Sequence, residues 1–158
     1  LQFLIKDVAS IMKSQQWRLS TSESCTGGWL AKSCTDLAGS STWFDCGFIT
    51  YSNQSKQDLV SVSKKTLETF GAVSEQTAIE MAQGALSHSN ADISVAITGI
   101  AGPDGGTVEK PVGTVWFAWA IKKQETKTQK YQFKGDREQV RIQAVIAALQ
   151  GIIKNARD

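Results

Sequence analysis

The sequence contains one histidine, His88, and three cysteines, Cys25, Cys34 and Cys46. The Ser-His-Asp triad, the Cys-His dyad and most zinc sites need a well-placed histidine, so their chemistry is largely excluded. His88 lies near the predicted end of a helix, where the helix dipole favours it without any catalytic role. The cysteines are odd in number and form no C-x-x-C pair, so we expect reduced thiols rather than a disulfide framework or a zinc ribbon.

The sequence also lacks a large excess of positive or negative charge, and it lacks long apolar runs. Seventeen Lys and Arg against fifteen Asp and Glu give a formal charge of +2, and no five like charges are adjacent, so no nucleic-acid partner is implied. The longest apolar stretch, residues 115–121, is far below the ~20 residues of a membrane span. The start of the chain lacks a signal-peptide pattern. We expect a cytoplasmic protein with no membrane partner.

Helical and strand patterns alternate along the chain. Apolar residues spaced three and four apart predict helices, and runs rich in β-branched and aromatic residues predict strands. The first three helices are expected over residues 1–12, around 30–37, and from the polar segment 52–55 through 60. Three more are expected over residues 64–70, from Ser74 to 86, and from Asp136 to 152. The strands are expected over residues 19–22, 44–51, 92–98, 112–121 and 126–133. Gly71 and Ser74 are predicted helix caps, and Asp136 with Gln139 resembles a capping box.

About five strands interleaved with helices predict a single α/β domain over residues 1–158, a three-layer α/β/α sandwich. The strand over 112–121 is apolar on both faces and should lie centrally, whereas the strand over 126–133 carries Lys and Gln and should be an exposed edge. These two strands follow each other closely, like a hairpin, so the sheet is expected to be mixed.

A glycine-rich loop follows the strand that ends near residue 98. It holds five of the thirteen glycines, at positions 99, 102, 105, 106 and 113. Ligands of α/β folds bind at the carboxyl ends of strands, and glycines let backbone N–H groups approach an anion, which favours a phosphate or carboxylate ligand. Simple turn geometry in a long connection explains the glycines equally well. The P-loop and G-x-G-x-x-G patterns are absent.

The segment 22–28 is a second turn between a strand and a helix, where unpaired N–H groups of the first helical turn attract negative charge. Ser24 or Cys25 in this place resembles a nucleophile elbow, although G-x-S-x-G is absent. The alternative is that the serines and Thr26 are helix caps and Cys25 is a small buried hydrophobe.

A serine nucleophile without histidine needs another base, and a buried lysine with a lowered pKa is the usual substitute. Lys56 is the candidate, because it closes the segment YSNQSK at 51–56, just after a predicted strand. The alternative is a solvated lysine on a short helix. Lys56 does not end an S-x-x-K motif, since position 53 is Asn, so a serine–lysine pair with Lys56 would join separate segments.

Three segments resemble the CinA carboxyl-terminal domain family: TSESCTGG at 21–28, GFITYSNQSK at 47–56 and ITGIAGPDGGTVEKPVGTVWFA at 97–118. The likeness extends to AGSSTWF at 38–44, GAVSE at 71–75 and GDREQVRIQA at 135–144, so it covers essentially the whole chain in order. The family's characterised activity is nicotinamide-nucleotide amidase, which converts nicotinamide mononucleotide to nicotinate mononucleotide and ammonia in pyridine nucleotide salvage. Longer CinA proteins carry an additional amino-terminal domain, so the resemblance implies the stand-alone form here.

The resemblance also implies roles for single residues. Ser24 would attack the carboxamide carbon, Lys56 would take its proton and pass it to the leaving ammonia, and Tyr51 would orient or relay that proton. The backbone N–H groups expected to hold the oxyanion are those of Thr26, Gly27 and Gly28.

The substrate implied is a small-molecule nucleotide, bound without a metal or cofactor, and homo-oligomers are common for such domains. The expected contacts to ribose and phosphate come from Thr98, Gly99, Gly102, Gly105 and Gly106. Lys110 or Arg137 is the expected countercharge.

Two other functions stay open. A silent or differently specific paralogue could act as a nucleotide-binding module, because a displacement of about 1 Å can cost ~100-fold in rate. Metal-dependent phosphate hydrolysis would need clustered carboxylates, and the glycine loop holds only Asp104 and Glu109, with Glu23 elsewhere, so it ranks last.

Overall fold

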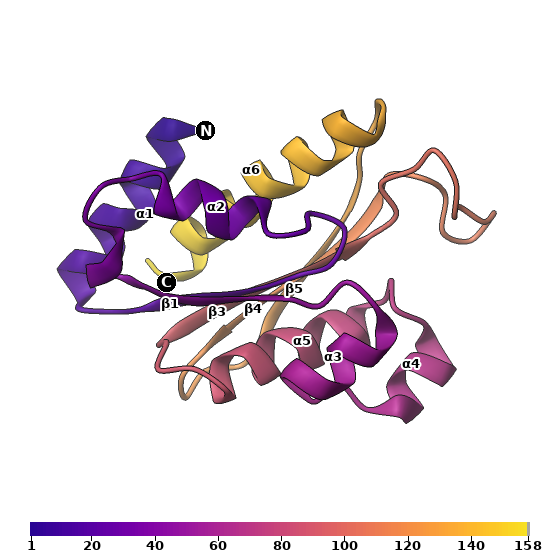
Figure 1. Ribbon diagram of the computed structural model, residues 1–158, viewed down its shortest axis with the longest axis horizontal. Helices are drawn as coiled ribbons and strands as arrows, with labels where there is room; N and C mark the ends of the chain where they lie inside the picture. Colours follow the sequence, from indigo (N-terminus) through magenta and orange to yellow (C-terminus); the bar gives the residue numbers. More distant parts are fainter. Residues whose placement is uncertain (158) are drawn as a thin grey trace.

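A five-stranded sheet separates two layers of helices (Figure 1). The computed structural model describes residues 1–157. The strands, in their order across the sheet, are β2 (Phe44–Ile49), β1 (Leu19–Glu23), β3 (Ile93–Gly99), β4 (Thr114–Ile121) and β5 (Lys127–Gln132). β2, β1 and β3 are parallel, whereas β4 is antiparallel to both of its neighbours. The predicted three-layer sandwich with a mixed sheet is confirmed, and the exposed β5 is an edge strand as expected.

Three helices cover each face of the sheet. One layer contains α1 (Gln2–Gln15), α2 (Trp29–Thr35) and α6 (Arg137–Asn155), and the other contains α3 (Asn53–Val60), α4 (Lys64–Phe70) and α5 (Glu75–Ser87) (Figure 1). A short 3-10 turn, η1 (Ser40–Thr42), lies between α2 and β2. Gly71 ends α4, Ser74 caps α5, and Asp136 forms the predicted capping box with Gln139 at the start of α6.

The two faces of the sheet differ in the size of their side chains. Towards α1, α2 and α6, the strands present large apolar residues of the main core, among them Ile97, Phe117 and Trp119. Towards α5, the apolar residues of the strands that pack in the second core are mainly alanines, and Ser94 donates a hydrogen bond of 2.6 Å to the carbonyl of Ala82 in α5. Small side chains let a helix approach the sheet closely, so α5 lies close against the strands.

Close packing continues from α5 to α3. A Cβ added at Gly84 of α5 would lie 1.8 Å from the backbone oxygen of Val60, the last residue of α3. Glycine is therefore required where the two helices meet. This contact brings α3, which carries Lys56, close against α5.

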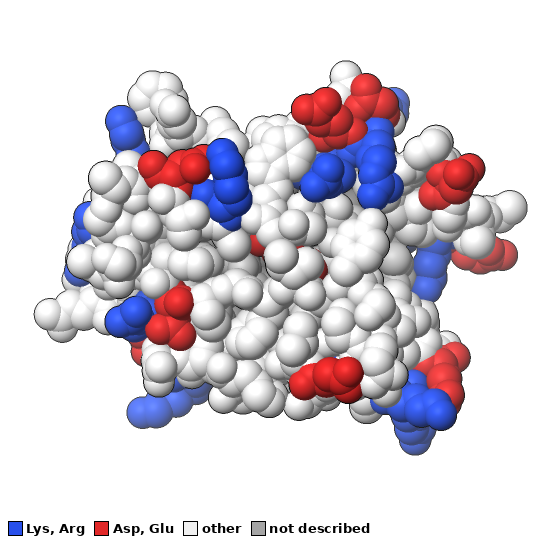
Figure 2. All heavy atoms as spheres, viewed as in Figure 1, with Lys and Arg blue, Asp and Glu red and all other residues white. Residues whose placement is uncertain are grey.

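The carboxyl ends of β1 and β3 lie side by side, because these strands are parallel neighbours. Ser24 follows β1, and the glycine loop at 100–113 follows β3 and projects beyond the sheet (Figure 1). This edge is where open α/β sheets bind ligands. Charged side chains of both signs are scattered over the face seen in Figure 2, with uncharged surface between them. No helix within residues 1–157 is both long enough and apolar enough to span a bilayer.

Candidate active site

Ser24 and Lys56 lie 32 residues apart in the sequence, and their side chains meet at the carboxyl edge of the sheet: Lys56 Nζ is 3.0 Å from Ser24 Oγ. The backbone N–H of Ser24 donates to the carbonyl of Ile97 in β3, at 2.9 Å, which ties the serine to the neighbouring strand. Lys56 lies near the start of α3, where the Ser52 side chain caps the helix. Only 9% of Ser24 and 1% of Lys56 is exposed. The fold thus assembles a serine–lysine pair from two separate segments.

Three acceptors surround Lys56 Nζ: Ser24 Oγ and the backbone carbonyl oxygens of Thr50 and Tyr51, the latter two at 2.8 and 3.2 Å. No carboxylate within residues 1–157 lies within 4.0 Å of this amine. Burial lowers the pKa of Lys56 to about 8. Carbonyl oxygens only accept hydrogen bonds, so a neutral amine gives them its two hydrogens and turns its lone pair towards Ser24. The arrangement suits a base that takes the serine proton.

Cys25, the other candidate nucleophile, is 7% exposed. Burial raises the pKa of its thiol to about 11. The thiolate is the reactive form of cysteine, so this environment disfavours attack by Cys25. Of the two neighbours, Ser24 has the geometry of a nucleophile.

A buried carboxylate holds the turn that follows Ser24. Glu23 is 1% exposed and accepts three backbone hydrogen bonds of 2.8 to 3.1 Å, from Gly28, Leu30 and Ala31 at the start of α2. An anion in this place satisfies N–H groups that a helix leaves unpaired and interacts favourably with the helix dipole. The turn between β1 and α2 is therefore held at its far end.

Two N–H groups in this turn, those of Cys25 and Thr26, have no acceptor in the described part of the chain. The N–H of Gly27 donates to the Ser24 carbonyl at 3.1 Å, and that of Gly28 to the buried carboxylate. Of the three predicted oxyanion donors, Thr26 is unengaged, whereas Gly27 and Gly28 already have partners. Cys25, which the sequence reasoning did not select as a donor, directly follows the serine, as the first donor of a nucleophile elbow does.

A cleft of about 260 Å³ opens beside Ser24. The predicted residues that line it are Ser24, Tyr51, Gly99, Gly102, Gly105 and Arg137. Asp104, a residue without a predicted contact, lines it too. Gly102 and Gly105 have φ of 82° and 91°, a region that glycine enters without strain, and the N–H groups of both have no acceptor within residues 1–157. The loop therefore exposes backbone donors at the cleft.

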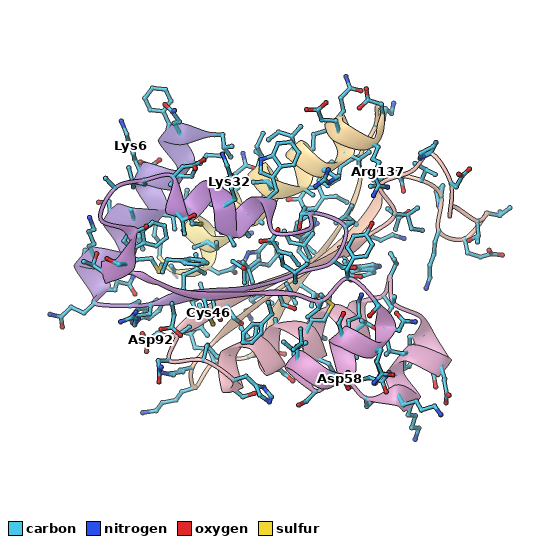
Figure 3. The ribbon with its side chains drawn as sticks, in the orientation of Figure 1. Lys6, Lys32, Cys46, Asp58, Asp92 and Arg137 are labelled. Atoms are coloured by element: carbon cyan, nitrogen blue, oxygen red, sulfur yellow. The ribbon has the colours of Figure 1, made fainter. Side chains whose placement is uncertain are left out.

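Arg137 borders the cleft at the start of α6. Its Nη1 donates to the carbonyl of Gly102 at 2.7 Å, and its Nη2 donates to the phenol oxygen of Tyr51 at 3.1 Å. No carboxylate among residues 1–157 lies within 4.0 Å, so its charge is open to an anion. Figure 3 shows Arg137 near the projecting loop, at the opposite end of the sheet from Asp92. Of the two predicted countercharges, Lys110 and Arg137, only Arg137 borders the cleft.

Three of the residues expected at the ribose and phosphate do not line the cleft. Thr98 is fully buried, and its hydroxyl donates to a backbone carbonyl on the α5 side of the sheet, at 2.7 Å. A Cβ at Gly106 would lie 2.7 Å from the backbone nitrogen of Val112, so turn packing explains this glycine. Lys110 donates to the carbonyl of Phe70 at 2.7 Å. The sequence places Thr98 at the end of its strand and Gly106 and Lys110 on the glycine loop, but it does not show where their atoms point.

Residues 1–156 match the CinA C-terminal domain family. The chain belongs to this family. It is 53% identical to nicotinamide-nucleotide amidohydrolase PncC of Enterobacter agglomerans, over 98% of this chain and 94% of the relative. It is also 53% identical to PncC of Escherichia coli K12, over 95% of this chain and 91% of the relative. The crystal structure of competence/damage inducible protein CihA from Agrobacterium tumefaciens is 41% identical, covers 99% of this chain and 95% of that one, and superposes with a TM-score of 0.96.

In this CinA domain, Tyr51 contacts the site in two ways. Its backbone carbonyl accepts from Lys56, and its phenol accepts from Arg137. The proton relay expected of the phenol has no hydrogen bond to Lys56 in the described chain and stays a prediction. No cluster of three His, Cys, Asp or Glu side chains suited to a metal ion occurs between residues 1 and 157.

Sequence reasoning missed Arg141, which donates to the carbonyls of Cys25 and Thr26. A signal was present, because Arg141 follows Arg137 by four residues on a predicted helix, and residues so spaced share a face. His88, by contrast, lies at the carboxyl end of α5 as the dipole interpretation expects, with Nδ1 2.8 Å from the carbonyl of Gly84.

Proposed function

We propose that this CinA domain hydrolyses the carboxamide of nicotinamide mononucleotide to nicotinate mononucleotide and ammonia, a step of pyridine nucleotide salvage. The observation that carries the proposal is the 3.0 Å contact between Ser24 Oγ and Lys56 Nζ beside an open cleft. An amide needs a nucleophile, a proton carrier and an oxyanion site, and this edge of the sheet supplies candidates for all three. The PncC relatives, named as nicotinamide-nucleotide amidohydrolases, support this choice of substrate.

In the first half of the reaction, neutral Lys56 takes the proton of Ser24 as Oγ attacks the carboxamide carbon. The bond from oxygen to carbon forms, and the carbonyl oxygen becomes an oxyanion. Lys56 then gives the proton to the nitrogen, the bond from carbon to nitrogen breaks, and ammonia leaves. An ester between Ser24 and the nicotinate group remains.

The second half repeats these steps with water. Lys56 takes a proton from water, whose oxygen attacks the ester carbon, and then returns the proton to Ser24 as the ester breaks. Nicotinate mononucleotide leaves and the amine is neutral again. A single base can serve both halves because its pKa is about 8. A group whose pKa lies near the pH of the reaction can both accept and release a proton.

The oxyanion in both halves needs hydrogen-bond donors that are fixed before the reaction. The N–H groups of Cys25 and Thr26 meet this need best, because neither has another acceptor in residues 1–157. The partners of Gly27 and Gly28 keep those two predicted donors engaged. We therefore assign the oxyanion to Cys25 and Thr26.

The 5′-phosphate is assigned to Arg137 and to the backbone N–H groups near Gly102 and Gly105. A guanidinium and unpaired peptide N–H groups are strong partners for a phosphate. Asp104, on the same loop, can accept hydrogen bonds from ribose hydroxyls. Tyr51 and Gly99 line the same cleft as Ser24 and Arg137.

The test is to mix the purified protein with nicotinamide mononucleotide and to follow ammonia and nicotinate mononucleotide, with and without a metal chelator. We expect equal amounts of both products and no effect of the chelator. Binding of the mononucleotide without ammonia would indicate the nucleotide-binding module instead. Inhibition by the chelator would indicate a metal-dependent mechanism.

A further inference from the structure

Arg141 holds two consecutive carbonyls of the turn that follows Ser24. Its Nε donates to the oxygen of Cys25 at 3.1 Å, and its Nη2 donates to the oxygen of Thr26 at 3.0 Å. The guanidinium also lies over the ring of Trp29, 5.3 Å from the ring centre. No carboxylate within residues 1–157 lies within 4.0 Å of it. The half-buried cation is therefore held by peptide carbonyls and an aromatic ring rather than by an ion pair.

A hydrogen bond that fixes a carbonyl also fixes the orientation of the N–H group in the same peptide unit, because the unit is planar. The carbonyl of Cys25 belongs to the same peptide unit as the N–H of Thr26, and in a trans unit the two point in opposite directions. Arg141 therefore directs the Thr26 N–H away from α6. A cationic donor on the carbonyl also polarises the peptide unit, which makes its N–H a stronger donor.

The N–H that Arg141 orients has no acceptor among the described residues, and Thr26 is fully buried. A buried N–H without a partner costs free energy, so its presence needs an explanation. The hydroxyl of Thr26 is also buried without a partner. Two unmatched polar groups two residues after Ser24 point to a ligand atom that arrives there.

We propose that Arg141 is a positioning residue, which orients the Thr26 N–H to stabilise the oxyanion of the reaction. The proposal rests on the proposed function for its substrate. Arg141 and Arg137 lie one helical turn apart and have different tasks. Arg137 borders the cleft, whereas Arg141 acts through the backbone of the turn.

Three variants test this role: R141Q, R141K and the control K154Q, which removes one positive charge from an exposed position of the same helix. Loss of one oxyanion donor costs roughly 100-fold or more in kcat, so we expect R141Q to lose ~10- to 100-fold. KM and the pH midpoint should stay near wild type, because neither Lys56 nor Arg137 is changed. R141K should recover part of kcat, since an ammonium can reach one carbonyl. K154Q should match wild type.

A second reaction tests the same role without the nucleotide. In labelling by an organic phosphonofluoridate, Ser24 Oγ forms a bond to phosphorus, fluoride leaves, Lys56 takes the hydroxyl proton, and negative charge develops on the phosphoryl oxygen. Intact-mass measurements should show slower labelling in R141Q by ~10-fold or more and an unchanged rate in K154Q. This arm remains decisive if the wild-type protein releases no ammonia, which would refute the proposed function alone.

Several results would overturn the role of Arg141. These are labelling and kcat in R141Q within about twofold of wild type, a rise in KM that accounts for the whole loss, or a shifted pH midpoint. Melting temperatures of all three variants identify a variant that has not folded. If R141Q does not fold, the role depends on R141K, which must then show slower labelling than wild type with an unchanged KM.

Discussion

The two ends of the cleft are built differently. At the reaction end, formed by Ser24, Lys56 and the turn after Ser24, both side chains are nearly buried and each proton of the Lys56 ammonium has an acceptor. At the binding end, formed by Arg137 and residues 99–106, the arginine is exposed and several backbone donors have no acceptor within residues 1–157. At the reaction end the side chains of Ser24 and Lys56 are paired before a ligand arrives, while N–H groups of the turn lack acceptors in the described chain, whereas the cation of the binding end is itself open to a ligand.

The cations at the two ends explain this difference. Burial lowers the pKa of Lys56 to about 8, which raises the fraction of neutral amine that can take a proton. A guanidinium stays charged in proteins, so Arg137 suits a permanent contact with an anion and needs solvent access for that anion to enter. Changes at the reaction end should therefore reduce kcat, and changes at the binding end should weaken nucleotide binding.

The largest effect is expected for S24A. Removing the nucleophile should lower kcat at least ~100-fold, while the melting temperature stays near that of the wild-type protein. C25A is the matched control at the neighbouring position and should keep its activity, because burial keeps that thiol protonated. Full activity in S24A together with loss in C25A would show that the nucleophile is Cys25.

A similar loss is expected for K56A, and K56R should not restore the rate. Arginine keeps the positive charge but does not give up its proton, so it cannot act as the base. In the wild-type protein, protonated Lys56 is inactive, and kcat should rise with pH through a midpoint near the pKa of about 8. The measurement is ammonia release across the pH range. A rate that does not change between acid and alkaline pH would remove Lys56 from this role.

A smaller effect is expected at the binding end. Nicotinamide riboside lacks the phosphate and should bind at least ~1.5 kcal/mol more weakly than the mononucleotide, roughly tenfold in Kd. R137Q should weaken binding of the mononucleotide by a similar factor and leave riboside binding unchanged. Calorimetric titration of each ligand into the wild-type protein and into R137Q gives the four dissociation constants. Equal affinities of the wild-type protein for the two ligands would show that the binding end does not recognise phosphate.

The smallest effect is expected for K110Q. Lys110 lies on the glycine loop but donates to the carbonyl of Phe70 and does not border the cleft. Removing its charge should leave kcat and KM within about twofold of wild type, the usual scale for a surface change. A rise in KM comparable to that of R137Q would extend the binding end to the outer part of the loop.

The order and type of the main helices and strands could be predicted from the sequence, because periodicity and capping residues record local structure. Asp136 and Gln139 form the predicted capping box, and Lys64 to Phe70 form the predicted helix. Ser24 and Lys56 were selected by the shortage of histidine and by resemblance to a family. Their 3.0 Å separation depends on the packing of α3 against α5, which no local pattern records.

The roles predicted for single residues depend on where their side chains and N–H groups point, and the sequence does not contain this information. Thr98 stands at the predicted strand end, but its side chain points to the opposite face of the sheet. Gly27 and Gly28 lie in the predicted turn, but their N–H groups are engaged by Ser24 and by the carboxylate of Glu23. Which N–H groups remain unpaired is decided by hydrogen bonds within tight turns and between residues far apart in the sequence.

The central claim is that Ser24, activated by Lys56, forms a covalent ester with the substrate. It is tested most directly by quenching the reaction with acid during turnover of nicotinamide mononucleotide and mapping the modified peptide by mass spectrometry, with S24A as the blank. We expect an added mass equal to the mononucleotide minus ammonia, located on Ser24 and absent from the variant. An adduct located on Cys25, or ammonia release by S24A at the wild-type rate, would contradict the claim.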